Sequence, residues 1–294
     1  MMRWLFVAGN SQARYSPTHA IEIPMKTFTL NNGVRMPSIG LGVLFAKEDG
    51  EVERAILSAL QSGYRKIDTA SAYGNEAGVG RAIRASPLQR EDLFLTTKVW
   101  NTEQGYDETL RSFEQSLERL QTDYVDLYLI HWPVKDKYQA TYRALEQLYA
   151  EGRVKAIGVC NFSIPQLEDL MAASTIVPTL NQVEMHPHLS QNELLAFAQR
   201  HRIQLEAWRP IMMGEVLKLP TLVEIGQAHS KSAVQVALRW LIQRGVAAVP
   251  KSVTPTRIAD NFRVYDFELS AAQMAQIEAL NQDRHLGEDL SHVV

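Results

Sequence analysis

The chain has 294 residues, of which 46% are hydrophobic and 21% charged, so it can bury the large core of a globular protein. Its formal net charge is −3, and no run of Lys and Arg interleaves with aromatic residues, so we expect no nucleic-acid partner. No apolar stretch approaches the roughly 18 residues of a spanning helix, and the run at 4–9 is short for a signal peptide, so we expect no membrane association.

An N-terminal extension, residues 1–24, comes first and shows no sustained hydrophobic period. Because Met25 could itself be an initiator, we predict that this extension is poorly ordered and that residues 25–294 form one catalytic domain. Next, residues 27–30 and 34–36 flank an Asn-Asn-Gly sequence. The Asn-Gly pair favours the positive φ of a tight hairpin.

Apolar runs of strand length then alternate with amphipathic segments of helical period. The predicted strands cover residues 39–43, 66–69, 93–98, 125–130, 156–159, 180–184, 204–208 and 247–250. The predicted helices cover residues 52–61, 76–85, 108–120, 140–150, 164–172, 192–199 and 233–243. Within 108–120, apolar residues recur at three- and four-residue steps, which indicates one buried face. They are Leu110, Phe113, Leu117 and Leu120.

The repeated alternation, without a Pro- or Gly-rich linker, predicts an α/β fold with a single (β/α)8 barrel of about 250 residues. A doubly wound sheet is the competing interpretation. That fold would favour a Gly-x-Gly-x-x-Gly motif after the first strand, whereas Gly74, Gly78 and Gly80 lie near the second unit with the wrong spacing.

Four polar residues, Asp68, Tyr73, Lys98 and His131, lie at or just beyond strand ends and would converge on one mouth of a barrel. A buried Lys98 paired with Asp68 should favour the ionised form of Tyr73, lowering its pKa towards working pH and making it a usable general acid. His131 can donate a hydrogen bond to a carbonyl oxygen. Such a set can protonate an oxyanion as a carbonyl becomes an alcohol, which requires an external hydride source.

Each of these residues also has an ordinary structural explanation. A strand-end Lys often extends along the surface, an Asp after a strand often caps a helix, and a loop Tyr or strand-end His often only packs. Four such coincidences on adjacent strands are less expected than one shared site.

Six segments in chain order, spread between about residues 26 and 280, resemble the signature segments of the aldo-keto reductases. They are 68–76 (DTASAYGNE), 97–100 (TKVW), 131–133 (HWP), 158–162 (GVCNF), 181–184 (NQVE) and 250–254 (PKSVT). The resemblance implies a (β/α)8 barrel closed at the bottom by the hairpin, with extra helices near the C-terminus. It also implies NAD(P)H bound across the mouth and a catalytic tetrad of Asp68, Tyr73 as proton donor, Lys98 and His131.

The resemblance also implies a set of cofactor contacts. Asn161 and Gln182 carry amides suited to the nicotinamide carboxamide, and Trp208 offers an aromatic face to the ring. Two cations and free backbone N–H groups near the last strand-to-helix junction suit a ribose 2′-phosphate, so we expect NADPH rather than NADH. The predicted contacts are Asp68, Cys160, Asn161, Gln182, Trp208, Arg209, Pro210, Lys251, Ser252, Val253, Thr254, Arg257, Asp260 and Asn261.

Two positions depart from the family pattern. Cys160 stands where Ser is common, which should weaken one polar contact near the carboxamide. Arg209 also stands where Ser is common, and we hypothesise that it contacts the cofactor phosphates. An Arg209→Ser protein that binds NADPH as tightly, with unchanged salt dependence, would rule this contact out.

The predicted substrate pocket contains Tyr73, Trp100, His131 and Trp132. The loop after Pro133 is brief and little chain follows residue 280, so we expect short pocket walls suited to small aldehydes. Segments 135–138 and 208–214 look most like the bacterial glyoxal and methylglyoxal reductase branch. The expected activity is NADPH-dependent reduction of small aldehydes and ketones to alcohols, with a 2,5-diketogluconate or aldose reductase as the alternative.

Two other classes of function stay open. Lys98 could be the Schiff-base nucleophile of an aldolase, or the barrel could be a non-catalytic nicotinamide-binding or structural protein. The single cysteine, Cys160, excludes an intrachain disulfide and argues against a zinc cluster, so we expect no metal site. We expect a cytoplasmic monomer, because a lone cysteine suits a reducing compartment and no segment marks an interface.

Overall fold

The structure is a computed structural model that describes residues 25–290, 292 and 293, so the predicted extension, residues 1–24, lies outside the described residues. The first elements, β1 (Thr27–Thr29) and β2 (Arg35–Pro37), form an antiparallel hairpin. Gly33 takes a φ of 89° in the turn, as predicted for the Asn-Gly pair.

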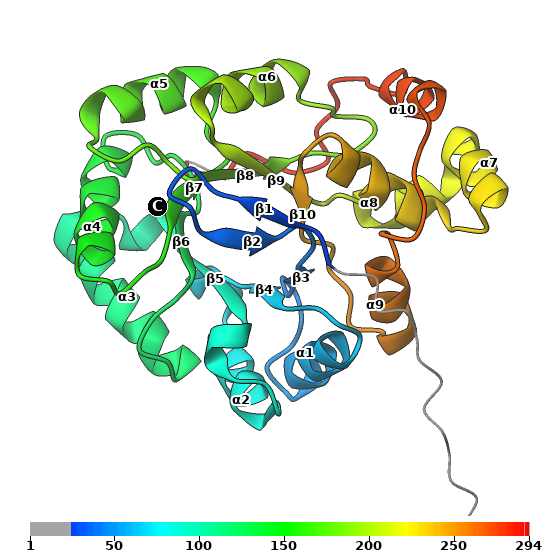
Figure 1. Cartoon of the computed structure of the whole chain (residues 1–294). Helices are drawn as coiled ribbons and strands as arrows, with labels where there is room; N and C mark the ends of the chain where they lie inside the picture. Colours follow the sequence, from blue (N-terminus) through cyan, green and yellow to red (C-terminus); the bar gives the residue numbers. More distant parts are fainter. Residues whose placement is uncertain (1–24, 291, 294) are drawn as a thin grey trace, which may run out of the picture.

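Eight parallel strands follow in sequential order around a barrel (Figure 1). Backbone N–H groups of Gly40 and Gly42 donate to the carbonyl oxygens of Ala248 and Pro250, which joins the first strand segment to the last. The predicted (β/α)8 barrel is therefore confirmed. The strands are β3 (Leu41–Gly42), β4 (Lys66–Asp68), β5 (Phe94–Val99), β6 (Leu127–Ile130), β7 (Ile157–Cys160), β8 (Leu180–Glu184), β9 (Gln204–Trp208) and β10 (Ala247–Ala248).

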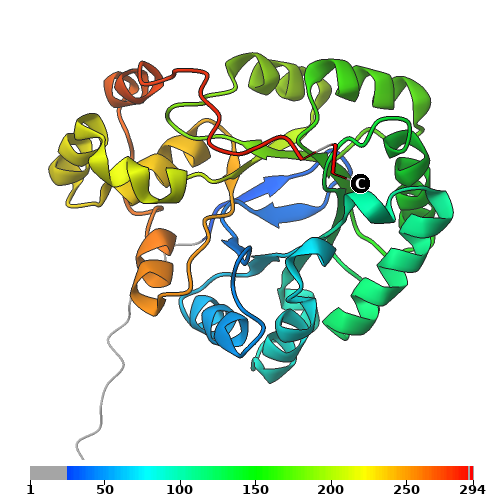
Figure 2. The ribbon, with the colours of Figure 1, turned by 180° about the vertical axis from the view of Figure 1, so that it is seen from behind.

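Helices surround the barrel on the outside (Figures 1 and 2). Those close to their predicted bounds are α1 (Glu51–Gln61), α2 (Glu76–Ala85), α3 (Tyr106–Leu120), α4 (Tyr138–Ala150), α5 (Ile164–Ala173), α6 (Asn192–His201) and α8 (Ala233–Gln243). The additional helices towards the C-terminus are α7 (Pro220–His229), α9 (Pro255–Phe262) and α10 (Ala271–Glu278). Within the described ranges, every helix is too short or too polar to cross a membrane.

The last strand is shorter than its predicted range of 247–250. β10 ends at Ala248, although the N–H of Val249 still donates to the carbonyl of Ala207 on β9. Pro250 has no N–H and cannot extend the ladder, which accounts for the early end.

The hairpin closes one end of the barrel. Leu30 and Met36 from the hairpin are buried in one apolar cluster with Phe94, Leu127 and other inward-facing strand residues. The opposite end, where the carboxyl ends of the strands lie, is the mouth at which barrel enzymes place their chemistry.

Candidate active site

The structure brings the four polar residues predicted at strand ends together at the mouth. Asp68 ends β4, Lys98 lies in β5, His131 follows β6, and Tyr73 ends a short 3-10 helix, η1 (Ser71–Tyr73). The Lys98 Nζ donates to Asp68 Oδ1 at 2.6 Å and to the carbonyl of Thr69 at 2.9 Å. It also lies 3.4 Å from the Tyr73 hydroxyl, so the carboxylate, ammonium and phenol form one continuous chain.

The imidazole of His131 lies beside the phenol. Its ring centroid is 5.6 Å from that of Tyr73 and 5.0 Å from that of Trp100, with edge-to-face geometry in both pairs. Its Nδ1 atom is buried and has no hydrogen-bond partner among the described residues. Two predicted pocket aromatics thus hold an imidazole whose Nδ1 is not bonded to any described protein group.

The electrostatics correct one prediction. Burial raises the pKa of Tyr73 to about 12, and the Lys98 charge lowers this pKa by less than burial raises it. The prediction that Lys98 brings the pKa of Tyr73 down towards working pH is therefore wrong, because the sequence indicates the cation but not the extent of burial. Tyr73 keeps its proton at neutral pH, which is the state that a proton donor requires.

The neighbouring groups differ in charge state. Burial lowers the pKa of Lys98, but the Asp68 and Tyr73 oxygens outweigh burial and raise it overall, so Lys98 stays an ammonium. Burial and the Lys98 charge together lower the pKa of His131 far below its usual range, so the imidazole is neutral. The site thus offers a neutral phenol, a neutral imidazole and a fixed cation.

Four of the predicted cofactor residues lie beside this group. Asn161 donates from Nδ2 to the carbonyl of His131 at 3.0 Å and accepts from Trp208 Nε1 at 2.8 Å. Asn161 has a φ of 64°, a conformation that Asn tolerates better than most residues. Gln182 donates from Nε2 to Asp68 Oδ2 at 2.8 Å, and the thiol of Cys160 lies 4.0 Å from Gln182 Oε1.

The predicted phosphate-binding residues lie on the turn between β10 and α9 and in the first turn of α9. Lys251 forms a bridge with Gly42 on β3, and Gly42 pairs in register with Asp68 on β4, so this turn lies one strand away from Asp68. The side chains of Lys251, Thr254 and Arg257 are exposed. Of the other predicted residues, Ser252 and Val253 are half-buried, Asn261 is buried, and Asp260 pairs with Arg263 at 3.6 Å.

Arg209 and Pro210 follow β9 at the mouth. The Arg209 guanidinium lies over the Trp208 ring at 5.5 Å and donates to the carbonyl of Leu286. Its φ of 51° is unusual for a residue other than Gly, Asn or Asp. Pro210 is buried. The hypothesised contact between Arg209 and cofactor phosphates stays a prediction, and in the structure this side chain binds the C-terminal tail.

The C-terminal tail, residues 281–290 and 292–293, crosses the mouth (Figure 2). Glu184 at the end of β8 accepts from the backbone N–H groups of Leu286 and Gly287 at 2.9 and 3.1 Å. Asn101 donates to the carbonyl of Leu290 at 2.6 Å, on the far side of the mouth. Short pocket walls stay an expectation, and the tail is held at the mouth by contacts on both sides.

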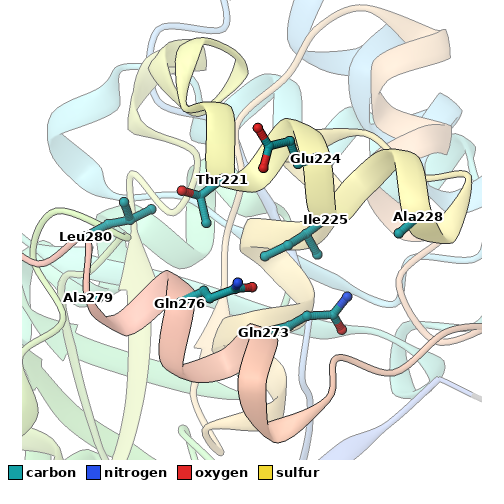
Figure 3. A pocket seen from close by; sticks show the side chains of 8 residues that line it. All are labelled: Thr221, Glu224, Ile225, Ala228, Gln273, Gln276, Ala279 and Leu280. Atoms are coloured by element: carbon teal, nitrogen blue, oxygen red, sulfur yellow. The ribbon is translucent and has the colours of Figure 1, made fainter.

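A hollow elsewhere does not belong to this site. It has a volume of about 470 Å³ and lies between α7 and α10 (Figure 3), away from the carboxyl ends of the strands. Among its described lining residues, Glu224 is the one titratable side chain. We therefore assign no reaction to it. Within residues 25–290 and 292–293, no group of three His, Cys, Asp or Glu side chains could hold a metal ion.

Three buried charged residues near the site were not predicted from the sequence. Lys66 and Glu206 form an ion pair inside the barrel, and Glu184 anchors the tail. The available signal was the two-residue period of a strand: Lys66 shares a face with Asp68, and Glu206 shares one with Trp208. That period gives the face but does not indicate which strands meet across the barrel.

Comparison with known proteins gives a consistent set of relatives. A family model described as the aldo/keto reductase family matches residues 38–282. The chain is 53% identical to the uncharacterized oxidoreductase YtbE and 51% identical to the glyoxal reductase, both of Bacillus subtilis, over 89% of this chain and 95% of each relative. It is 44% identical to the methylglyoxal reductase DkgA of Salmonella typhimurium, over 88% of this chain and 95% of the relative.

Solved structures agree in fold. An aldo/keto reductase from Brucella melitensis superposes with a TM-score of 0.85 at 48% identity, covering 87% of this chain and all of that one. A Bombyx mori aldo-keto reductase in complex with NADP gives a TM-score of 0.85 at 34% identity, covering 90% of this chain and 96% of that one.

Proposed function

Because the chain belongs to the aldo/keto reductase family, we propose that it reduces small aldehydes and ketones of the glyoxal and methylglyoxal type to alcohols. Two relatives that match nearly the whole chain are named for these substrates, and a solved neighbour was crystallised with NADP. The chain is an NADP-dependent oxidoreductase. The observation that carries the proposal is the series of hydrogen bonds from Asp68 through Lys98 to a protonated Tyr73, which lies beside a neutral His131.

The residues at the mouth fit NADPH. Gln182 presents an amide oxygen whose described neighbour is a thiol at 4.0 Å, and Trp208 presents a half-buried indole. Lys251 on the preceding turn and Arg257 in the first turn of α9 are exposed cations, and helix N–H groups at an N-terminus also favour an anion. Asn161, Gln182 and Trp208 would hold the nicotinamide end, and Lys251 to Asn261 the phosphate and adenine end. The bound cofactor supplies the hydride.

The chain's own residues do the proton chemistry. Tyr73 holds a proton, because its pKa is about 12, and delivers that proton to the carbonyl oxygen as charge develops there. The Lys98 ammonium then stabilises the phenolate that remains, and Asp68 fixes the ammonium in place. The neutral His131 carries one N–H, which can donate to the same oxygen and orient the carbonyl.

A panel assay tests the activity. Loss of NADPH absorbance would be followed with methylglyoxal, glyoxal, aromatic aldehydes, aldoses and diketo sugar acids, with NADH as the comparison. We expect the highest kcat/KM with the small dicarbonyls and with NADPH. Highest activity with sugars or diketo acids would instead favour the aldose or 2,5-diketogluconate alternative, and NADPH binding without consumption would favour the non-catalytic one.

A single substitution tests the role of the phenol. Tyr73→Phe should cut kcat by at least about 100-fold, because it removes the proton donor but little packing volume. NADPH binding, followed by protein fluorescence, should stay within about twofold of the wild type. Retained turnover would refute this role.

The aldolase alternative is disfavoured by charge. A Schiff base requires a neutral amine, whereas Asp68 raises the pKa of Lys98 and keeps it protonated. Borohydride trapping of substrate on Lys98 would instead support the aldolase. The proposal also takes residues 25–294 as one domain that acts as a cytoplasmic monomer, and size-exclusion chromatography would check the monomer.

A further inference from the structure

A second ion pair lies below the tetrad, inside the barrel. Lys66 on β4 and Glu206 on β9 contact each other directly, and neither side chain has exposed surface. The Lys66 Nζ also lies 3.0 Å from the sulfur of Met36, in the hairpin that closes the barrel. At Gly40 a Cβ would lie 2.8 Å from Lys66 Cγ, so the missing side chain leaves room for the lysine.

Gln182 connects this pair to the tetrad. Its Nε2 donates to Glu206 Oε2 at 2.8 Å and to Asp68 Oδ2 at 2.8 Å, so both amide hydrogens are used. Two carboxylates, which only accept hydrogen bonds, therefore lie on the nitrogen side of one amide. This arrangement fixes the orientation of the amide on chemical grounds, because the opposite orientation would turn Oε1 towards two anions.

The other polar atom of the Gln182 side chain is the amide oxygen, Oε1. Oε1 meets the thiol of Cys160 at 4.0 Å, which is a weak donor at a long distance. The strong acceptor that Gln182 offers at the mouth is thus available to a ligand N–H. A ligand that presents only a carbonyl oxygen to Gln182 Oε1 would form no hydrogen bond there, because both atoms are acceptors.

We propose that Glu206, held by its counter-charge Lys66, is a positioning residue that orients Gln182 so that it accepts a hydrogen bond from the carboxamide N–H of the cofactor. This inference rests on the proposed function, since it takes NADPH as the ligand. Glu206 acts through Gln182 and does not itself contact the cofactor. Lys66 supplies the positive charge without which a carboxylate in this apolar interior would be strongly disfavoured.

A cofactor analogue separates this role from a merely structural one. The 3-acetylpyridine analogue of NADPH keeps the carbonyl group attached to the ring but has a methyl group in place of the carboxamide NH2. The wild type should bind NADPH about 3- to 10-fold more tightly than the analogue, the value of one neutral hydrogen bond. Fluorescence titration without a carbonyl substrate measures both affinities independently of turnover.

Glu206→Gln should reduce this preference to less than about twofold, because one of the two carboxylates that orient Gln182 becomes an amide that can donate or accept. If this variant folds poorly, the double variant Lys66→Met/Glu206→Leu replaces the pair with apolar groups, and it should show the same loss of preference. Glu76→Gln is the matched control. Glu76 is also buried and paired, with Arg119, but it lies outside the barrel interior. The Glu76→Gln variant should therefore keep the wild-type preference for NADPH over the analogue.

The outcomes are distinct. A preference that is unchanged in Glu206→Gln and in the double variant would overturn the positioning role and leave the reductase proposal intact. A wild type that binds both compounds equally would overturn it too. A wild type that binds NADPH with the expected preference but consumes none would contradict the proposed function alone, and absence of NADPH binding would overturn both.

Discussion

The barrel contains two buried lysine–carboxylate pairs whose surroundings differ. Lys98 and Asp68 lie at the mouth, and the ammonium reaches the Tyr73 hydroxyl at 3.4 Å. Lys66 and Glu206 lie deeper, and there the ammonium reaches the Met36 sulfur and lies 5.4 Å from the ring of Phe94. Burial and pairing are thus common to both. Among the described contacts, the upper pair reaches a group that can give up a proton near the open end, whereas the lower pair does not.

Gln182 makes the two pairs one network. Its amide bonds to Asp68 above and to Glu206 below, so the two pairs share one hydrogen-bonded side chain. The distinction is therefore one of role. The upper pair should set the rate of the chemical step, whereas the lower pair should set the orientation of Gln182, and each pair should contribute to stability.

Breaking the upper pair should have the largest effect. Lys98→Met removes the cation that stabilises the Tyr73 phenolate and leaves Asp68 without a counter-charge. We expect kcat to fall about 100- to 10,000-fold and the free energy of unfolding to fall by about 3–5 kcal/mol. NADPH oxidation with methylglyoxal and urea unfolding measure the two effects. A variant that is only less stable, with normal kcat, would place Lys98 with the lower pair.

Breaking the lower pair should affect stability first. Lys66→Met leaves Glu206 buried and unpaired, so the free energy of unfolding should again fall by about 3–5 kcal/mol. The kcat of the folded fraction should stay within about tenfold of the wild type, since Tyr73, Lys98 and Asp68 keep their contacts. The double variant Lys66→Met/Glu206→Leu should recover most of the lost stability, because no charge remains unpaired. If Lys66→Met lost as much kcat as Lys98→Met, the two pairs would not differ in role.

The two pairs also differ in how far the sequence predicts them. Asp68 and Lys98 lie at the ends of neighbouring strands, so a parallel sheet is enough to bring them together. Lys66 and Glu206 are 140 residues apart, on strands that meet only across the closed barrel. Their contact depends on strand register and on the space at Gly40, and local patterns encode neither of these.

The same limit explains the wrong pKa prediction and the missed tail. The spacing of strand ends indicates that Lys98 lies near Tyr73, but the pKa of the phenol is set mainly by how much protein surrounds it. That quantity depends on the whole mouth, including His131 and Trp100. Likewise, Glu184 binds backbone amides about 100 residues later in the chain, and no side-chain motif in the tail indicates this contact.

Alkaline pH should give the smallest effect, and it also distinguishes the two pairs. The pKa of Tyr73 is raised from 10.0 to about 12 by burial, against the opposing charge of Lys98, while Asp68 and Cys160 raise it further. Below about pH 10 both folded and unfolded chains keep this proton, so the contribution of the neutral phenol to stability is fully present. Between about pH 10 and 12 the unfolded chain loses the proton first, and on the order of 2 kcal/mol of stability is lost.

Tyr73→Phe isolates this contribution from those of other buried tyrosines. The difference in unfolding free energy between wild type and variant should be constant from about pH 7 to 9 and should shift in favour of the variant by about pH 11. Lys66→Met provides the comparison, because no phenol is hydrogen-bonded to Lys66 in the described part of the chain. The difference in unfolding free energy between the wild type and Lys66→Met should not show the alkaline shift that Tyr73 causes. Equal alkaline shifts in the two variants would show that the phenol is coupled to the whole network and not to the upper pair alone.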